Sequence, residues 1–266
     1  MATYTFESVA DFGRAMKRDI LKPMYENAQW SGETYAESLD RAINGDTRRV
    51  AEAEKILGQV QAEIETVGRQ WQNAVAGSIP SVPDYLMGHP ESMRQLTSYV
   101  SEAAPIRIWV GTNSSASINH EDLRKRGVAV LAAAMALSQS RPVELWTFGT
   151  MDGNGKWGEC NIKVRLNAAP LDLAEACVAL SSIGFDRNLT HNWGFAKDSF
   201  TGGWAKVVRG HLGDEAELVA ACREMLEADA GDLIVPPSSN KFSEVISNPI
   251  GWVQKILASY SCGEVA

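Results

Sequence analysis

The sequence predicts an α/β protein in which a sheet carries helices on both faces, preceded by an N-terminal helical region. Three observations support this prediction. Strand-like and helix-like segments alternate from residue 105 onward, which is the pattern of a three-layer sheet domain. The segment 127–135 is apolar nearly all round, as expected of a helix packed on both sides. Residues 35–64 place apolar side chains three and four positions apart, which indicates helices.

The residue pattern divides the chain into three regions. Residues 1–80 should form the helical region, residues 81–104 a structured connection, and residues 105–266 the α/β domain. Within the first region, the Asn-Gly-Asp sequence at 44–46 is typical of one helix ending and another beginning. A weaker amphipathic stretch at 9–20 predicts a further helix.

The connection is the most distinctive stretch of the chain. Residues 74–93 contain three prolines and two glycines, which rule out a continuous helix. Their aromatic and aliphatic side chains are unlike those of a solvated linker. We therefore predict that 81–93 clasps the helical region onto the α/β domain, with Tyr85, Leu86 and Met87 largely buried.

Each element of the last region has its own signal. Strands are indicated by short apolar or alternating runs, and helices by longer periodic runs between capping residues. An Asp-Gly-Asn-Gly turn before the run 159–166 predicts a hairpin partner at the edge of the sheet. Residues 184–211, rich in Gly, Trp, Asn and Asp, are assigned to no element. The expected strands are 106–110, 143–148, 159–166 and 232–235, and the expected helices are 121–139, 172–182, 214–228 and 251–260.

The most informative loop follows the first expected strand of the α/β domain. Asn113, Ser115 and Ser117 alternate along this loop, so that their side-chain oxygens face one side. The layout resembles the metal-binding loop of von Willebrand factor A domains, in which Asp-x-Ser-x-Ser faces a divalent cation. Here Asn113 occupies the position of the Asp. The resemblance therefore implies the fold and weakens the usual function of that fold.

Three further motifs are similar to those of a family of von Willebrand A-like proteins of unknown function encoded by tailed bacteriophages. They are Val-Pro-Asp-Tyr-Leu-Met-Gly-His-Pro-Glu-Ser-Met at 82–93, Pro-Leu-Asp at 170–172, and Asn-Pro-Ile-Gly-Trp-Val at 248–253. The resemblance covers about 30–260 and implies a von Willebrand A-like sheet and a phage origin, but no activity. The chain departs from the family pattern at 182–188, where it reads Ser-Ile-Gly-Phe-Asp-Arg-Asn.

A working cation site is not expected in this loop, and no cofactor is predicted. Mg²⁺, the weaker alternative, requires oxygen ligands, normally with a carboxylate among them, whereas the loop supplies neutral oxygens only. The implied fold completes its site with a Thr from a later loop, for which Thr190 and Thr201 are both candidates, and with an Asp after its fourth strand. Pro-Pro-Ser-Ser at 236–239 replaces that Asp. Ser238 should lie beside Asn113 at the carboxyl ends of the strands.

Composition narrows the class of function. The net charge of −8 and the pI of about 5.1 argue against a protein that coats nucleic acid through its overall field. Basic clusters at 124–126 and 14–22 keep nucleic-acid binding as the alternative. No apolar run approaches the ~20 residues needed to span a bilayer, so no membrane partner is expected. Four widely spaced cysteines are typical of a reduced cytosolic protein.

Motifs of catalysis are absent from the sequence. It contains no Gly-x-Ser-x-Gly, no His-Glu-x-x-His and no phosphate loop ending in Gly-Lys-Ser/Thr. We therefore predict a non-enzymatic interaction or assembly module acting in the cytoplasm of an infected bacterium. Its partners would be a phage or host protein, or further copies in a homo-oligomer. Trp193 and Trp204, in a Gly-rich region, are candidates for the interface. A divalent-metal-dependent enzyme is the weaker alternative.

Overall fold

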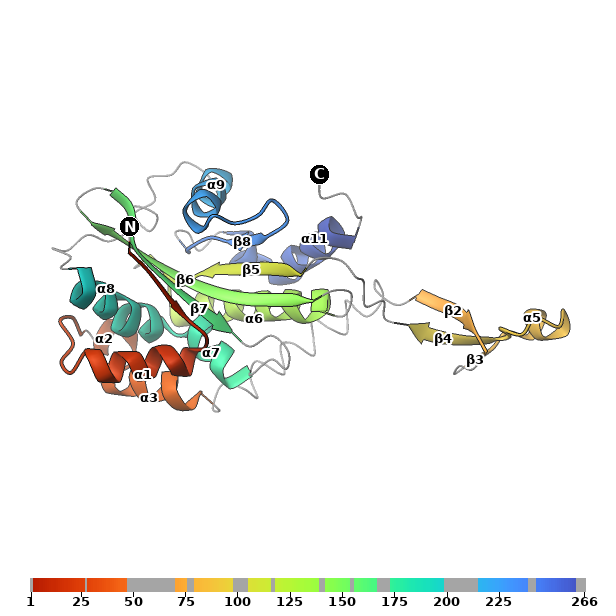
Figure 1. Cartoon of the computed structure of the whole chain (residues 1–266), viewed down its shortest axis with the longest axis horizontal. Helices are drawn as coiled ribbons and strands as arrows, with labels where there is room; N and C mark the ends of the chain where they lie inside the picture. The colour runs from red at the N-terminus through yellow and green to blue at the C-terminus, as the bar shows by residue number, and fades with distance from the viewer. Residues whose placement is uncertain are drawn as a thin grey trace.

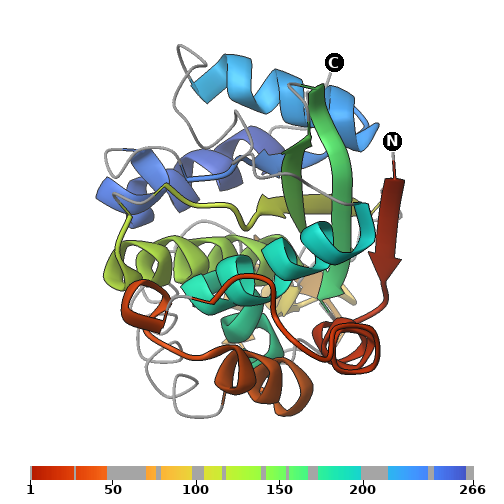
Figure 2. The ribbon, with the colours of Figure 1, turned by 90° about the vertical axis from the view of Figure 1, so that its left-hand side faces the viewer.

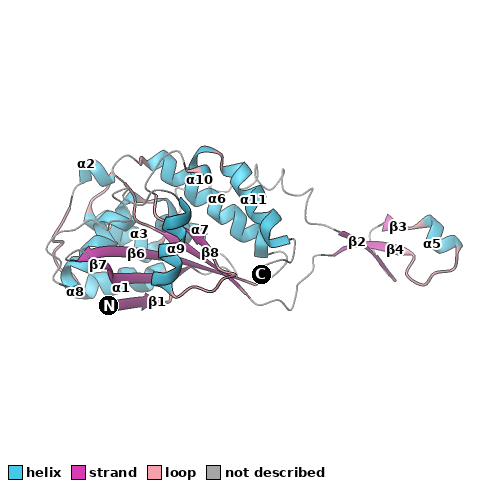
Figure 3. Ribbon diagram, turned by 90° about the horizontal axis from the view of Figure 1, so that it is seen from above, coloured by secondary structure: helices cyan, strands magenta, loops and turns pink. Residues whose placement is uncertain are grey.

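The described residues form two separate sheets. In the computed structural model these residues are 2–26, 28–46, 70–75, 79–97, 105–115, 118–138, 142–153, 156–166, 173–198, 215–238 and 243–261. The larger sheet and most of the helices make up a main body. The smaller sheet and one helix make an arm, which Figures 1 and 3 both draw apart from the main body.

Five strands form the main sheet: β1 (Ala2–Phe6), β5 (Ile106–Gly111), β6 (Val143–Gly153), β7 (Lys156–Leu166) and β8 (Leu233–Val235). Their order is β1-β7-β6-β5-β8. β5 is parallel to both of its neighbours, β6 and β8, whereas β7 is antiparallel to β6 and parallel to β1. The chain leaves β5 for β6 on one side and returns to β8 on the other. The strand order therefore reverses at β5.

All four strands expected in the α/β domain are present, but β7 is not an edge strand. β1 pairs with it along its outer side, with Tyr4 opposite Ile162. The prediction of an edge was wrong because β1 comes from the first residues of the chain, far from β7 in sequence. Tyr4 and Phe6 of β1 alternate with threonines and pack against the main core, which is the pattern of a half-buried strand.

Helices pack against both faces of the main sheet (Figure 2). Successive strand residues point to opposite faces, so Ile108 and Val110 join the larger buried cluster while Trp109 joins a smaller one. α9 covers the smaller cluster. None of the helices in the described ranges is long and apolar enough to cross a membrane. The helices of the main body are α1 (Val9–Asp19), α2 (Ala28–Ser31), α3 (Tyr35–Asn44), α6 (His120–Ser138), α7 (Leu173–Ser181), the π-helix η1 (Phe185–Thr190), α8 (His191–Asp198), α9 (Glu215–Leu226), α10 (Glu244–Ser247) and α11 (Pro249–Ser261).

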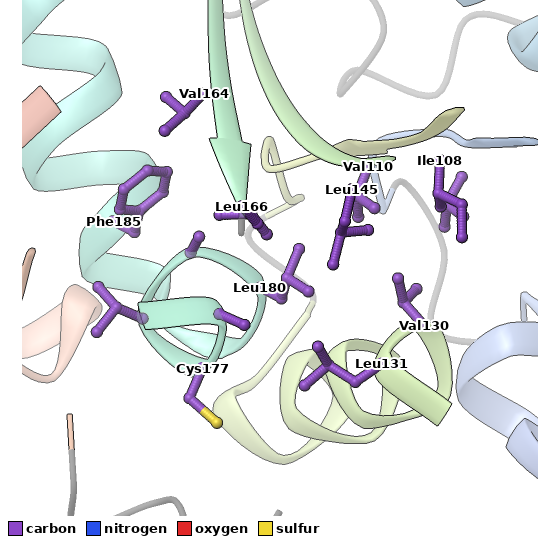
Figure 4. Packing of buried hydrophobic residues seen from close by; sticks show 14 of the residues in the cluster. Ile108, Val110, Val130, Leu131, Leu145, Val164, Leu166, Cys177, Leu180 and Phe185 are labelled. Carbon is purple, nitrogen blue, oxygen red and sulfur yellow. The ribbon is translucent and has the colours of Figure 1, made fainter. Parts of the chain in front are cut away.

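The larger core lies between the sheet and the helices α6 and α7 (Figure 4). Leu145 of β6 and Leu180 of α7 lie in the same cluster as Val130 and Leu131 of α6. α6 also contacts α10 and α11 on its other side. Residues 128–134 are therefore buried all round, as the apolar run in this helix predicted. Burial of each large apolar side chain stabilises the fold by ~1.5–3 kcal/mol.

The first long helices pack on this body. α1 contacts α3 and α7, and α3 also contacts η1. α3 begins with a capping box, in which the side chains of Thr34 and Glu37 each accept from the other's backbone N–H. It ends at Gly45, whose φ of 79° suits a residue without a Cβ. The helix end expected at 44–46 is confirmed, and the second helix expected after it lies outside the described residues.

The arm consists of β2 (Gln70–Ala74), β3 (Ile79–Pro80), α5 (Val82–Leu86) and β4 (Met93–Thr97), with the strands in the order β2-β4-β3. The prediction of a buried clasp was wrong for this segment. Tyr85, Leu86 and Met87 are 71%, 77% and 66% exposed. The reason is visible in Figure 1, where α5 stands at the far end of the small sheet and away from the main body.

Candidate functional site

The loop that follows β5 is joined to the segment that follows β8. The N–H of Ser238 donates to the carbonyl of Asn113 at 3.0 Å, and the N–H of Ser115 donates to the carbonyl of Ser238 at 2.9 Å. Ser114 and Ser238 thereby form an isolated parallel bridge beyond the two strands. The structure therefore brings three of the sequence-predicted site residues together at the carboxyl edge of the sheet.

The side chain of Asn113 is buried, and both ends of its amide are hydrogen-bonded. Its Nδ2 donates to Oδ1 of Asp186 at 3.1 Å, and its Oδ1 accepts from the backbone N–H of Thr150 at 2.8 Å. Only 2% of the residue is exposed. An aspartate here could not donate to Asp186. The amide is therefore matched to a neighbouring carboxylate.

Asp186 supplies the carboxylate of this site, and it comes from η1 instead of from the end of a strand. Its Oδ2 accepts from the N–H of Ser114 at 3.3 Å, and its Oδ1 accepts from the hydroxyl of Thr190 at 3.2 Å. Burial raises the pKa of this carboxyl, while the charges of His191 and Arg187 oppose the rise. Both carboxylate oxygens thus already accept hydrogen bonds from the protein.

Two basic side chains flank this carboxylate. His191 Nε2 lies 3.8 Å from Oδ1 of Asp186, and Arg187 Nη2 donates to the carbonyl of Ser114 at 3.1 Å. Burial lowers the pKa of His191, and it lowers the pKa of Arg187 to about 10. Removing one member of a buried charged group leaves another without its partner, which is costly. We call this set the Asp186 cluster; it comprises Asn113, Ser114, Asp186, Arg187, Thr190 and His191.

The π-helix η1 places these side chains and is itself held from behind. Every residue from Phe185 to Thr190 is buried. The ring of Phe185 lies 5.7 Å from that of Phe12 in α1, and Asn188 Nδ2 donates to Ser38 Oγ in α3 at 2.9 Å. Short π-helical turns are rare and are often found at functional sites. The N-terminal helices therefore help to position Asp186.

Sequence reasoning did not identify Asp186. The one signal for it was the departure from the family pattern at 182–188, which contains this residue. Of the two Thr candidates, Thr190 does reach the site, through its bond to Asp186. Thr201 and Ser117 lie outside the described residues.

Three buried hydroxyl groups lie around the same edge. Within the described part of the chain, Ser114 Oγ, Thr150 Oγ1 and Ser238 Oγ have no hydrogen-bond partner. Buried hydroxyls of this kind are ordinarily satisfied by ordered water. Together with Asp186 they offer a single carboxylate and neutral oxygens, a weak donor set for a hard cation. The described ranges also contain no group of three or more His, Cys, Asp or Glu residues that could hold a metal ion.

Trp193 does not lie on a surface, so its assignment to an interface was wrong. It is 3% exposed in α8, and its ring meets those of Tyr4 and Phe12 edge-on at 5.5 and 5.8 Å between centroids. The described part of the region that was left unassigned, residues 185–198, folds into helices, and Trp193 packs on Tyr4 of β1. Trp204 lies outside the described residues.

The basic run at 124–126 does not form a continuous solvated face. Arg126 is 2% exposed, and its Nη2 donates to the carbonyls of Val235 and Pro236 at 3.3 and 2.7 Å. Arg124 pairs with Glu121. Arg126 therefore anchors the end of β8, and this cluster supplies less exposed charge than its sequence indicated.

Comparison with known families gives one match. The family described as Domain of unknown function (DUF7192) matches residues 1–262. The chain belongs to this family. No curated protein and no solved structure matches it. The match spans the N-terminal helices, the arm and the main sheet together.

Proposed function

We propose that this chain is a non-enzymatic protein–protein interaction or assembly module, built on a von Willebrand A-like sheet whose metal loop is degenerate. Support for the fold comes from the strand order. β5 lies between the parallel strands β6 and β8, so the side on which the chain adds its next strand changes at β5. Ligand sites of open α/β sheets lie at such a reversal, beyond the carboxyl ends of the strands. The loop from Asn113 to Ser115 occupies that position.

The observation that carries the proposal is the state of Asn113 and Asp186. Their side chains are bonded to each other and to backbone N–H groups, and both residues are buried. Groups that hold a metal or act on a substrate need lone pairs or protons directed at the ligand. These two residues direct theirs at the protein. The proposed role of the cluster is therefore to brace the edge of the sheet.

Binding would then fall to surfaces away from this edge, and the arm supports that view. Its apolar side chains face solvent at the end of a projecting element. We further propose a phage origin, action in the host cytoplasm and a phage protein, a host protein or a second copy as the partner. The resemblance of 82–93 to the phage family supports the origin. The burial of Arg126 removes part of the basis for the nucleic-acid alternative.

Replacing Asn113 by Asp tests the proposal. Asn113→Asp would place a second carboxylate against that of Asp186. A divalent cation could then bridge the two carboxylates. The variant should melt at a lower temperature than wild type and should recover when Mg²⁺ or Mn²⁺ is added. A ligand at a hundredfold excess over its Kd stabilises the folded state by about 2.7 kcal/mol. The wild-type melting temperature should not respond to either ion.

A metal-dependent rise in the melting temperature of the wild type would contradict the proposal. The contradiction would be complete if Ser115→Ala abolished the rise, because the loop would then be a working cation site. Asn248→Asp is the matched control for the added carboxylate charge, since Asn248 is exposed and an aspartate there can still accept from the N–H of Gly251.

A further inference from the structure

Among the described residues, the large apolar side chains that face solvent fall into two groups. Leu21 and Met24 follow α1, and they are 90% and 68% exposed. The second group is on the arm and comprises Val75, Val82, Tyr85, Leu86 and Met87. Contiguous exposed apolar groups are typical of interaction surfaces, and Tyr, Leu and Met side chains provide large or adaptable contacts.

The two groups lie among charges of opposite sign. Residues 14–24 contain four basic and one acidic residue, a net charge of 4 − 1 = +3, whereas 81–93 contain two acidic residues and no Lys or Arg, a net charge of −2. Within the described residues, Lys17 and Lys22 beside the first group have no ion-pair partner, and neither has Glu91 beside the second. Opposite potentials of this kind steer association and set its register.

The two groups lie at opposite ends of the molecule. In Figures 1 and 3 the segment that follows α1 is at the end of the main body farthest from the arm. The tip of the arm therefore cannot cover Leu21 and Met24 of its own chain. A contact between the two groups would join different copies.

We infer that the arm tip of one copy binds the α1 surface of a second copy. The arm tip is Val82, Asp84, Tyr85, Leu86, Met87 and Glu91, and the α1 surface is Arg14, Lys17, Leu21, Lys22 and Met24. This inference rests on the proposed function, for which it names the partner. Because the contact joins two different surfaces, two copies joined by one contact still have one arm tip and one α1 surface free, to which further copies can bind. The assembly is then a closed ring or an open chain.

Charge reversal with mixing tests the inference. One variant is Lys17→Glu with Lys22→Glu, and the other is Asp84→Lys with Glu91→Lys. In each variant alone, the arm tip and the α1 surface carry charge of the same sign. Each should therefore sediment as a monomer at concentrations where the wild type assembles. An equimolar mixture of the two should assemble again, because each tip then meets a surface of opposite sign. Lys125→Glu, an exposed change on α6, is the control and should assemble like wild type.

Leu86→Ser provides a second variant that leaves the charges and the bond between Ser81 and Asp84 in place. It should weaken self-association on the order of tenfold or more, as loss of an apolar anchor does. Purified wild type that stays monomeric, or a mixture that fails to assemble, would overturn the inference. The proposed function would survive that result if the metal test holds and Leu86→Ser abolishes binding to a different protein. A wild type stabilised by metal would instead overturn the proposed function.

Discussion

The Asp186 cluster and the arm tip differ in what surrounds them. Three elements meet at this cluster, namely the loop after β5, the last part of β6 and η1, and they exclude solvent from polar side chains. At the arm tip, α5 is five residues long and follows two short strands, so its apolar side chains remain exposed. Burial here follows from the number of elements that meet at a place and not from the polarity of the residues there.

The two regions should therefore respond to substitution in opposite ways. Changes in the Asp186 cluster remove hydrogen bonds whose other members are buried, so they should act on folding. Changes at the arm tip remove side chains that the chain itself does not cover, so they should act on assembly. Measuring stability and self-association on the same variants separates these outcomes.

The largest effect is expected for Asp186→Ala. It removes the acceptor of Asn113 and Ser114 and the negative charge beside the buried Arg187 and His191. Breaking a buried pair in this way costs about 3–5 kcal/mol, which urea unfolding would detect. Asp40→Ala, an exposed control, should unfold close to wild type. An Asp186→Ala variant as stable as the control would show that the cluster does not brace the sheet.

A smaller loss is expected for Gly111→Ala at the end of β5. A Cβ there would lie 2.6 Å from the backbone N of Pro237, so that β5 and the segment after β8 must separate. Overpacking of this kind costs about 1–3 kcal/mol. Gly231→Ala is a matched control, because a Cβ on Gly231 meets nothing within 4 Å. Equal melting temperatures for the two variants would argue against the close approach of these segments.

The pH dependence of stability should change in His191→Gln. Burial lowers the pKa of His191 in the folded state, so the unfolded chain binds the proton first as the pH falls below about 6.5. The stability that this residue contributes in the wild type is then lost toward acid pH. His191→Gln should lose less stability between about pH 7.5 and pH 5.5.

Asp186 contributes with the opposite sign. Its raised pKa means that the folded state binds its proton more readily, so stability from this carboxyl is lost as the pH rises through that pKa. Wild type and His191→Gln share all the other histidines, so the difference between their stability curves reports on His191. Parallel stability curves for the two proteins would show that His191 has the same proton affinity folded and unfolded.

The smallest effect on folding is expected for Leu86→Ala. Leu86 is 77% exposed, and surface changes of this kind usually stay within about 0.5 kcal/mol. Leu145→Ala in β6 is the matched control, because Leu145 is fully buried and its truncation should cost ~2–5 kcal/mol. A large loss of stability in Leu86→Ala would mean that another part of the chain covers α5, which would restore the clasp hypothesis.

The elements that have a clear local pattern of apolar side chains or capping residues were predictable from the sequence. The apolar run at 106–110, the apolar segment 127–135 in α6 and the break at Gly45 are local patterns, and the structure contains each of them. β1 and η1 were not predicted, because an alternation over five residues is short evidence for a strand and a π-turn carries little periodicity. Trp193 was misassigned for a related reason, since its cover comes from β1 and α1.

The sequence by itself determined the α/β class, the principal strands and helices, and the position of the Asn113 loop at a strand end, because these depend on residues close together along the chain. Only the tertiary structure decided that Asp186 meets Asn113 across 73 positions of sequence, that Arg126 is withdrawn from the surface, and that the motif at 82–93 is exposed. Each of these depends on which distant elements come to lie beside a residue, and local patterns do not record that.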